Sequence, residues 1–376
     1  MSYLIDGRYV QDHFPGIGRY VYNLIRALAR RAPDQRFRVL WNPAQTSTRA
    51  NVEALARFPN VELARVAART FSLQEQFLGL DPAATRGIGL WHSAYYVMPY
   101  LLPVPTVVTL EDVTPLVLKE EMPNGMKRLL YRILSLLAAR RAAHVITLSR
   151  AAKTDIVRVL GITPDSITVV PLAADPCFRP VSAQEQAGAR GSLGLPERYG
   201  LYLGSNKPHK NLIRLVEAWA RVRADYPLII AGHWDPRYPR PKQVVEKLGL
   251  ADRVRFLHNV SAKDLPALLG AAAFFVFPSV HEGFGLPPLE AMACGTAVAC
   301  ANASSLPEVS GDAALLFDPF DVASMADALE RLSGDRSLAA ELRARGLEQA
   351  RRFSWERTAD ETLKVYRRSD AHPSYL

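Results

Sequence analysis

The stretch FPSVHEGFGLPPLEAMACG, residues 277–295, is the most informative part of this chain. An apolar run at 273–278 predicts a strand, and the loop after it contains Gly283 and Gly285. Two prolines then suit the first turn of a helix that runs to about Cys294. Free amides and the positive dipole end of such a helix can hold a diphosphate, and glycines let a ligand approach the backbone closely. The segment therefore predicts a strand–loop–helix unit that binds an anionic ligand.

The same stretch carries two carboxylates, Glu282 before the predicted helix and Glu290 inside it. Carboxylates accept hydrogen bonds from hydroxyl groups, so two of them aimed into one pocket suit a sugar and a ribose. The competing interpretation is an ordinary strand–turn–helix with surface glutamates, and the complete string favours the ligand site over it. The candidate ligand-binding residues of this stretch are Glu282, Gly283, Phe284, Gly285, Leu286 and Glu290.

Strand and helix patterns alternate on both sides of this segment. In the first half, strand patterns lie at 3–6, 37–41, 88–93, 106–110, 144–149 and 167–171, with amphipathic stretches at 17–32, 124–143 and 150–160. In the second half, strand patterns lie at 200–204, 227–232, 254–258, 273–279, 297–301 and 314–318. Buried strands separated by helices predict parallel sheets covered on both faces. Two such series predict an α/β protein with two doubly wound, Rossmann-like domains.

A polar stretch rich in proline and glycine, at roughly 175–198, is expected to separate the two domains. We expect a first domain over 1–175 and a second over 176–355. The closing segment, about 356–376, has a helical pattern and is expected to cross back to the first domain. Ligands of doubly wound folds bind at the carboxyl ends of the strands, so chemistry is expected in a central cleft that the two domains face.

Composition restricts the class of protein. Hydrophobic residues make up 49% and charged residues 22% of the 376 residues, which is ordinary for a globular chain. No apolar run reaches the roughly 20 residues of a membrane span, and the first residues lack a secretory signal pattern. The three cysteines show no CxxC spacing, which argues against a disulfide framework or a cysteine zinc site. A cytoplasmic location is therefore expected.

The net charge of +9 is unevenly distributed. Residues 1–175 hold 21 Lys and Arg against 14 Asp and Glu, a balance of +7, and the remainder holds 25 against 23, a balance of +2. A basic half suggests an anionic partner, such as nucleic acid, a phosphorylated ligand or an acidic membrane surface. A solvated basic surface is the favoured interpretation when charge is considered alone.

A second motif, YLGSNKPHKNL at 202–212, places Ser205, Lys207 and Lys210 after a predicted strand. Two ammonium groups on a strand–helix loop can neutralise a diphosphate, and the helix that follows adds its amide end. Only 9 of the 46 basic residues are lysines, yet two of them fall in this loop. That concentration favours a phosphate site over a pair of solvated lysines.

These motifs together resemble the family-4 retaining glycosyltransferases of the GT-B fold, and mannosyltransferase-like members in particular. The resemblance covers nearly the whole chain, since it is also carried by GIGRY at 16–20, SSLPEVSGDAALLFDP at 304–319 and FSWERTADETLKVY at 353–366. It implies transfer of a hexosyl group, best assigned as mannosyl, from a GDP- or UDP-linked sugar to a glycan, lipid-linked or small-molecule acceptor. The second domain would hold the donor and the first the acceptor, and neither a metal nor a cofactor is expected.

The resemblance also implies roles for single residues. Lys210, with Lys207 beside it, matches the loop that stabilises the departing nucleotide diphosphate in the family. Gly16 and Gly18 match a glycine-rich loop that lies beside the donor phosphate and the acceptor. Closure of the two domains would bring an acceptor hydroxyl to the anomeric carbon and exclude water.

One block departs from the family pattern. In VVTLEDVTPL, residues 107–116, Glu111 and Asp112 occupy the place of a His-Asp pair that lies near the donor sugar in the family. A glutamate supplies a hydrogen-bond acceptor there but not an imidazole ring, and it adds negative charge beside a developing oxocarbenium ion. The candidate catalytic residues are therefore Glu111 and Asp112 together with Lys210 and Glu282.

Some side chains near strand ends give weaker signals. These are His92, Ser93, Tyr95 and Tyr96, which follow one strand, and His258 and Asn259, which follow another. For the first group, a satisfied histidine and packed tyrosines are at least as good an interpretation as a sugar site. For the second group, the resemblance implies that the backbone contacts the nucleotide base.

Residues 124–143, NGMKRLLYRILSLLAARRAA, form an amphipathic and basic helix pattern. Its apolar arc consists of Met126, Leu129, Leu130, Ile133, Leu134, Leu136 and Leu137, and its opposite side carries Lys127, Arg128 and Arg132. The favoured interpretation is a helix that covers the sheet, with its apolar face in the core. The alternative is a peripheral contact with the anionic inner face of a membrane that carries the acceptor.

Other functions stay open on the sequence. A sugar-nucleotide-binding protein without transfer activity is supported only by Glu111. A different GT-B enzyme, such as a sugar-nucleotide epimerase or a glycan phosphorylase, would share the fold, although a phosphorylase is usually much larger. No nucleic-acid-binding motif is present, so nucleic acid is not an expected partner.

Several catalytic motifs are missing. The sequence has no Asp-x-Asp, which is the metal clamp of the other major glycosyltransferase fold. It also has no GxxxxGKS/T loop, no H-E-x-x-H and no G-x-S-x-G. The sequence therefore lacks the motifs that an ATPase, a zinc protease or an α/β-hydrolase needs, and these functions are not expected.

Overall fold

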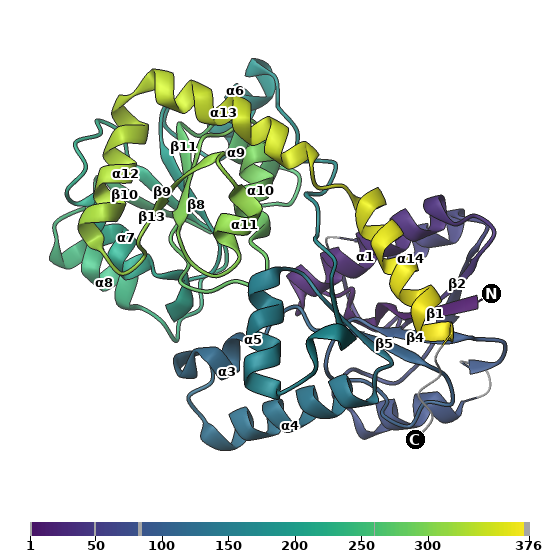
Figure 1. Ribbon diagram of the computed structural model, residues 1–376. Helices are drawn as coiled ribbons and strands as arrows, with labels where there is room; N and C mark the ends of the chain where they lie inside the picture. The colour runs from purple at the N-terminus through teal and green to yellow at the C-terminus, as the bar shows by residue number, and fades with distance from the viewer. Residues whose placement is uncertain (1, 49, 82–84, 259, 372–376) are drawn as a thin grey trace. The chain divides into compact units, whose positions relative to one another are not determined.

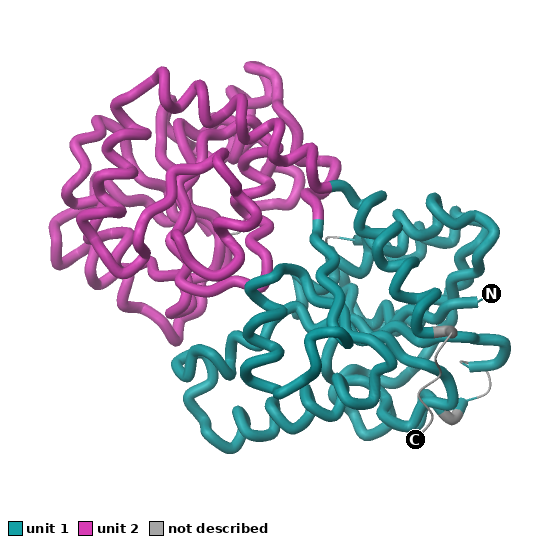
Figure 2. The backbone as a smooth tube through the Cα atoms, viewed as in Figure 1, with its two compact units in different colours: residues 1–172, 354–376 teal, residues 173–353 magenta. Residues whose placement is uncertain are grey.

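The computed structural model describes residues 2–48, 50–81, 85–258 and 260–371 of the chain (Figure 1). The chain forms two compact units (Figure 2). Unit 1 consists of residues 1–172 and 354–376, and unit 2 consists of residues 173–353. The chain thus leaves unit 1 once and returns to it with its last helix.

A parallel sheet forms the centre of unit 1. Its strands are β1 (Ser2–Asp6), β2 (Arg36–Trp41), β3 (Val61–Arg65), β4 (Leu90–Ser93), β5 (Thr106–Thr109), β6 (His144–Thr147) and β7 (Ile167–Val169). They lie in the order β3-β2-β1-β4-β5-β6-β7, and β1 pairs with β2 in parallel from Ser2↔Arg36 to Asp6↔Leu40. The strand order reverses at β1, so the carboxyl ends of β1 and its neighbours form a switch point of the kind at which ligands bind.

The last helix of the chain completes unit 1. The helices of this unit are α1 (Pro15–Arg31), α3 (Thr114–Val117), α4 (Gly125–Arg141), α5 (Arg150–Leu160) and α14 (Trp355–Ala371). Its short 3-10 segments are η1 (Gly7–Tyr9), η2 (Val52–Arg57), η3 (Leu73–Leu80), η4 (Lys119–Glu121) and η5 (Pro164–Ser166). α14 packs against α1 (Figure 1), where Arg31 pairs with Asp360 at 2.9 Å. Deeper in the unit, the Tyr366 hydroxyl is hydrogen-bonded to His92 Nδ1 at 2.6 Å, so α14 is tied to the sheet as well.

Unit 2 is built around a second parallel sheet. Its strands are β8 (Gly200–Leu203), β9 (Leu228–Ala231), β10 (Val254–Leu257), β11 (Phe274–Phe277), β12 (Val298–Ala301) and β13 (Ala314–Phe317), in the order β10-β9-β8-β11-β12-β13. Its helices are η6 (Pro208–Lys210), α6 (Ala183–Ser192), α7 (Leu212–Trp219), α8 (Arg240–Lys247), α9 (Leu265–Gly270), α10 (Leu286–Ala293), α11 (Leu306–Ser310), α12 (Val322–Gly334) and α13 (Arg336–Arg351). Every residue of β11 and β12 is buried. Such continuously apolar strands are what a sheet covered on both faces requires.

The predicted architecture of two parallel α/β sheets is confirmed, and each expected strand is present. The structure adds β3, which the sequence pattern did not reveal. This strand, VELAR, lies at the sheet edge, and its residues are mostly half-buried or exposed. An edge strand meets water on one side, so it tolerates the polar residues that obscured its pattern.

The helix expected at 124–143 packs against β5 of the sheet, but the expectation that its apolar face lies in the core is wrong. The buried residues of α4 are Tyr131, Ser135, Ala138 and Ala139. Most of the apolar arc is exposed instead: Met126 76%, Leu129 52%, Leu130 55%, Ile133 45% and Leu137 48%. The buried stripe follows the helical period at positions 131, 135 and 138, and the small side chains of Ser135, Ala138 and Ala139 let that part of the helix approach the unit closely. None of the described helices is long and apolar enough to cross a membrane.

Candidate active site

The loop between β8 and α7 of unit 2, the lysine loop, carries Lys207 and Lys210. Asn211 holds it in place, with a left-handed φ of 59° and a buried side chain. The Asn211 amide donates to the carbonyl oxygens of Pro278, at 3.2 Å, and Pro319, at 2.7 Å. Because Pro278 directly follows β11, these bonds bring the lysine loop against the segment that the sequence singled out.

Lys210 and Glu282 form an ion pair at this junction. Lys210 Nζ lies 2.5 Å from Glu282 Oε1, and each side chain is 15% exposed. The ammonium also lies 5.3 Å from the centre of the Phe277 ring. Burial alone would raise the pKa of Glu282, but the Lys210 charge and hydrogen bonds from Lys210 and Ser279 hold it below its usual value. The Glu282 carboxyl is therefore ionised at neutral pH.

Two serines that the sequence analysis did not assign support the turn after Glu282. Ser304 Oγ donates to the carbonyl oxygen of Glu282 at 2.8 Å, and Ser305 Oγ donates to the carbonyls of Glu282, at 3.0 Å, and Phe284, at 2.7 Å. Ser305 is completely buried. Only the position of the SS pair shortly after the strand predicted at 297–301 could have indicated this role. The two serine hydroxyls therefore anchor two carbonyls of the turn.

The amides of this turn are free to bind a ligand. Gly285 precedes α10 with a φ of 105°, and a Cβ there would lie 2.6 Å from Leu306 Cδ2, so only glycine fits. Within the described part of the chain, no group accepts a hydrogen bond from the amides of Phe284, Gly285 or Leu286. The prolines at 287 and 288 have no N–H, so these three amides supply most of the donors at the start of α10.

The remaining donor-site candidates of unit 2 occupy different environments. Glu290 is 2% exposed within α10. The carbonyl of Ser205 accepts from the Tyr202 hydroxyl at 2.7 Å. Lys207 is exposed, and none of the described residues forms an ion pair with it. Lys210, Glu282 and the turn after Glu282 are thus brought together, whereas Lys207 projects into solvent.

Gly16, Gly18, Glu111 and Asp112 belong to unit 1. Both glycines lie within the first turn of α1, because this helix begins at Pro15, two residues earlier than the expected start at residue 17. A Cβ on Gly18 would lie 3.0 Å from the Tyr9 carbonyl oxygen, so Gly18 allows close packing against η1, while Gly16 faces open space. Gly18 therefore has a packing role in addition to any ligand contact.

Glu111 and Asp112 follow β5. The Asp112 carboxylate accepts a hydrogen bond from the amide of Thr114, the first residue of α3, at 2.8 Å. Burial, with a smaller contribution from the Asp112 charge, raises the pKa of Glu111 from 4.5 to about 8. Glu111 is therefore mostly protonated at neutral pH and brings a neutral carboxyl group where the sequence suggested a negative charge.

The weaker candidates of unit 1 are packed residues. His92 is fully buried between the Tyr366 hydroxyl and Thr109 Oγ1, at 2.6 and 2.8 Å, and burial lowers its pKa to about 3. Tyr95 and Tyr96 pack on each other with ring centres 4.3 Å apart. The satisfied-histidine interpretation of His92 is therefore confirmed.

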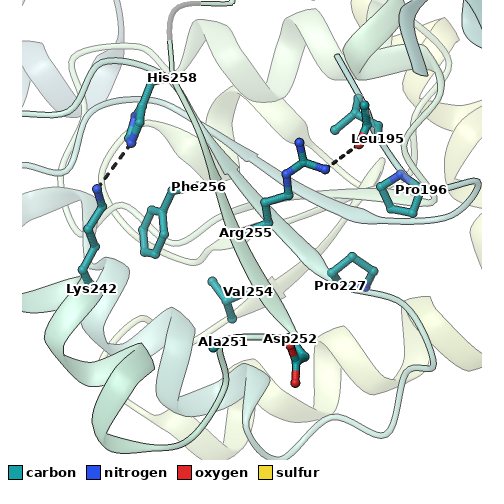
Figure 3. Close-up of a pocket in the computed structure, with 11 residues that line it drawn as sticks. Leu195, Pro196, Pro227, Lys242, Ala251, Asp252, Val254, Arg255, Phe256 and His258 are labelled. Atoms are coloured by element: carbon teal, nitrogen blue, oxygen red, sulfur yellow. Dashed lines mark hydrogen bonds between the residues drawn. The ribbon is translucent and has the colours of Figure 1, made fainter. Parts of the chain in front are cut away.

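A separate cavity of about 720 Å³ lies along β10 in unit 2 (Figure 3). Its lining includes Lys242 and His258, which point toward each other with their nitrogens 3.4 Å apart. The Lys242 ammonium also lies 4.4 Å from the centre of the Trp234 ring. None of the predicted diphosphate-binding residues lines this cavity. Asn259, the neighbouring sequence candidate, lies outside the described residues.

The chemistry of the Glu282 region suits a phosphorylated ligand. A lysine supplies positive charge and three consecutive amides supply donors, all at the carboxyl end of a parallel strand. Among the residues that the structure describes, no group of three or more His, Cys, Asp or Glu side chains is arranged to hold a metal ion. Lys210 and the amides of the turn are therefore candidates for binding a diphosphate.

Solved structures share the whole architecture. The sucrose-phosphate synthase of Thermosynechococcus elongatus is 24% identical with a TM-score of 0.77, over 98% of this chain and 99% of that one. Anabaena Alr3699/HepE, solved with UDP and glucose, is 21% identical with a TM-score of 0.74, again over 98% and 99% of the two chains. These likenesses show that the protein has the GT-B fold.

Sequence relatives define the family. Residues 15–177 match Glycosyltransferase Family 4, and residues 189–353 match Glycosyl transferases group 1. The O-antigen chain mannosyltransferase B of Escherichia coli is 35% identical over 286 residues, which cover 74% of each chain. The serotype-specific mannosyltransferase WbdA of Escherichia coli is 31% identical over 71% of this chain, but the match spans only 34% of that longer protein. The chain belongs to the family-4 glycosyltransferases, as the sequence motifs indicated.

Proposed function

We propose that the protein is a retaining mannosyltransferase that moves a mannosyl group from a nucleotide-diphosphate sugar, GDP-mannose first among them, to an acceptor hydroxyl. The acceptor is a glycan, either free or lipid-linked. The assignment of the donor site is supported by the Lys210–Glu282 pair, which lies beside the free amides of residues 284–286. The names of the Escherichia coli relatives, both mannosyltransferases, support the choice of sugar.

In this proposal, unit 2 stabilises the leaving nucleotide diphosphate. Lys210 and the amides of the turn are fixed before the reaction by Asn211 and the two serines, so they need no reorganisation when negative charge develops. Glu282 orients Lys210 and offers its second carboxylate oxygen to a sugar hydroxyl, and Glu290 accepts from the ribose. Because the charge is neutralised by lysine and amides, transfer requires no metal or cofactor, and EDTA should leave the rate unchanged.

A donor screen followed by a transfer assay tests this function. GDP-mannose should raise the melting temperature more than UDP-glucose does, and wild-type protein should transfer mannose to a mannose-terminated glycan. Lys210→Ala should reduce kcat about 10²–10³-fold, the loss expected when one preorganised charge donor is removed. Lys263→Ala, at an exposed lysine of the same unit, is the matched control and should have no effect.

The outcomes separate the alternatives. Stabilisation by GDP-mannose without turnover on any glycan tried would favour a sugar-nucleotide-binding protein. Retention of the anomeric configuration in the product would distinguish transfer of the proposed kind from an inverting reaction. If no nucleotide sugar stabilises the protein, the proposed function is wrong.

We also propose that α4 makes a peripheral contact with an anionic membrane. Five apolar side chains of this helix are exposed, and the helix GMKRLLYRILSLLAARR has no acidic residue. Lys127, Arg132 and Arg140 are exposed on the same helix. Moving exposed apolar side chains from water into the interface of a bilayer lowers the free energy, and anionic headgroups attract the cations.

Vesicle flotation tests this contact. Wild-type protein should float with phosphatidylglycerol vesicles at low salt and remain free with phosphatidylcholine vesicles. Leu130→Ser with Ile133→Ser should abolish flotation, whereas Phe320→Ser, at an exposed phenylalanine of unit 2, should not. Absence of binding to anionic vesicles at low salt would refute the contact.

A further inference from the structure

Three aromatic side chains of unit 1 meet in the loops that follow its strands. Phe14 lies between β1 and α1, Phe71 lies between β3 and η3, and Tyr95 follows β4. The ring centres of Phe14 and Phe71 are 6.0 Å apart, and the Tyr95 ring lies 5.9 Å from the first and 6.2 Å from the second. We call these three rings the aromatic cluster. Because β1, β3 and β4 run parallel, the cluster follows the carboxyl ends of its strands, where doubly wound folds bind ligands.

The cluster presents one ring to solvent on a packed base. Phe71 is 54% exposed, whereas Phe14 and Tyr95 are half-buried. Both half-buried rings pack on the buried Tyr9, at 5.4 Å between ring centres in each case. The Tyr9 hydroxyl donates to the Val97 carbonyl at 2.6 Å, which ties this base to the loop after β4. The exposed Phe71 ring therefore rests against side chains that are fixed in place.

The backbone of Phe71 is strained. Its φ is 64°, in the left-handed region that a bulky side chain rarely adopts. Such a conformation raises the free energy of the folded state and persists only where the surrounding structure enforces it. Exposure of a large apolar ring to water adds nothing to stability either. A strained and exposed phenylalanine is therefore better explained by a ligand than by the fold.

A buried ion cluster enforces this conformation. The Phe71 amide donates to Glu75 Oε2 at 2.9 Å, and Arg8 Nη2 donates to Glu75 Oε1 at 2.7 Å and to Asp6 Oδ2 at 2.5 Å. The side chains of Asp6, Arg8 and Glu75 are all 0% exposed. Buried ion pairs seldom add net stability, because their charges lose the hydration that they have in water. In this unit they tie the Phe71 turn to η1 and so fix the place of the exposed ring.

The surroundings of the aromatic cluster favour a neutral ligand. Within two sequence positions of its three residues, the exposed charged side chains are Asp12 and Arg69, one of each sign. The helix α4 differs, because it carries basic residues and no acidic one. A balanced surface gives no electrostatic preference to a phosphate or an anionic bilayer. The exposed His13 ring lies 4.6 Å from Phe14, edge to face, and its nitrogens can exchange hydrogen bonds with hydroxyl groups.

We propose that the aromatic cluster is a sugar-binding subsite, at which one neutral pyranose ring of the acceptor glycan stacks on Phe71. The carbon-bound hydrogens of the sugar lie on the negative face of the aromatic ring, and its hydroxyls point to water and to His13. The assignment of the sugar to the acceptor rests on the proposed transfer function. The presence of a sugar subsite in unit 1 rests on the exposed ring, its enforced backbone and its polar surroundings.

The same segment provides a matched control. Phe77 is 65% exposed, even more than Phe71, but it belongs to η3 and makes no ring contact among the described residues. Phe71→Leu and Phe77→Leu each replace an exposed aromatic ring by an apolar side chain that has no π face. Phe71→Tyr keeps the aromatic face and is the conservative variant. A difference between the two leucine variants therefore reports stacking on the cluster and not apolar exposure in general.

Saturation-transfer difference NMR measures binding without a donor or a reaction. The methyl glycosides of mannose, glucose, galactose and rhamnose are titrated against the wild type and the three variants. Wild type, Phe71→Tyr and Phe77→Leu should bind at least one sugar with the same dissociation constant, and Phe71→Leu should raise that constant about 3–10-fold, the range of one aromatic contact. Absence of binding to the wild type, or equal dissociation constants for Phe71→Leu and either wild type or Phe77→Leu, would overturn the proposal.

Kinetics connect the subsite to the reaction. With a mannose-terminated oligosaccharide as acceptor, Phe71→Leu should raise the acceptor KM about 3–10-fold and leave the donor KM unchanged, whereas Phe77→Leu should change neither. Absence of transfer by the wild type would contradict the proposed function, while the NMR titration still decides whether the subsite exists. In an active enzyme, an unchanged acceptor KM in Phe71→Leu would refute the role of the subsite in acceptor binding.

Vesicle flotation tests a membrane as the competing occupant. Phe71→Ser should float with phosphatidylglycerol vesicles to the same extent as the wild type, because the proposed partner of this ring is a sugar. A loss of flotation in Phe71→Ser relative to the wild type would assign the ring to the bilayer and overturn the proposal.

Discussion

The protonation of Glu111 leads to a prediction about the pH dependence of stability. Burial and the neighbouring Asp112 charge raise the pKa of Glu111 from 4.5 to about 8. Between these two pH values the folded chain binds a proton that the unfolded chain has released. Rising pH must therefore lower the stability of the folded state across this window, and the full loss is reached above pH 8.

The size of the effect follows from the shift in pKa. Between pH 6 and pH 9, the free energy of unfolding falls mainly over the two pH units below the folded pKa of about 8. At about 1.4 kcal/mol per unit, this fall amounts to about 2.7 kcal/mol. The Glu111 side chain is half-buried, so water screens part of this and about 1–2 kcal/mol is expected. At pH 7, about nine molecules in ten carry the proton.

Urea unfolding of wild type and Glu111→Gln at pH 6 and pH 9 measures this loss. Glutamine keeps a neutral polar group at the position but does not titrate, so the variant should lose about 1–2 kcal/mol less than the wild type between the two pH values. Glu120→Gln, at an exposed glutamate of the same unit, should behave like the wild type. Equal losses for wild type and Glu111→Gln would show that Glu111 is already ionised at pH 6 and would refute the reasoning.

Three further predictions concern unit 2. Lys210→Ala leaves the carboxylate of Glu282 without its cation in a site where each side chain is 15% exposed. Urea unfolding should therefore show a free energy of unfolding lower by about 1–3 kcal/mol, and an unchanged value would contradict the ion pair. Gly285→Ala places a Cβ at a φ of 105° and 2.6 Å from Leu306 of α11, so it should lower the free energy of unfolding by about 2–4 kcal/mol. Gly249→Ala, at a φ of 65° with open space around it, should lower it by only about 1 kcal/mol. Equal costs for the two glycine variants would exclude the steric argument. Asn211→Ala removes two buried hydrogen bonds and should lower the melting temperature, with a loss of about 2–4 kcal/mol, and an unaltered melting temperature would show that the loop is anchored by other contacts.

Much of the fold could be predicted because strand and helix patterns are local. The alternation of apolar runs with amphipathic stretches was sufficient to predict both parallel sheets, and only the polar edge strand β3 was missed. The segment from Glu282 to Glu290 was recognisable for the same reason, since its glycines, prolines and carboxylates lie within one strand–loop–helix.

The supports of the site could not be predicted in the same way. Asn211 reaches carbonyls 67 and 108 positions away in the sequence, and Ser305 reaches a carbonyl 21 positions away. Polar residues of these types are common in loops, and nothing in a single sequence indicates which distant carbonyl they will meet. The structure was also needed to distinguish Lys210, which is paired with Glu282, from the exposed Lys207.

The sequence by itself determined the fold class, the family and the segments of unit 2 that hold the donor-site candidates, because each is written in patterns of a few consecutive residues. Tertiary structure alone decided which face of α4 is exposed, that burial raises the pKa of Glu111, and that Asn211 and Ser305 support the turn of the candidate site. These properties depend on burial and on contacts between distant segments. Both are set by packing in three dimensions, which the order of residues along the chain does not display.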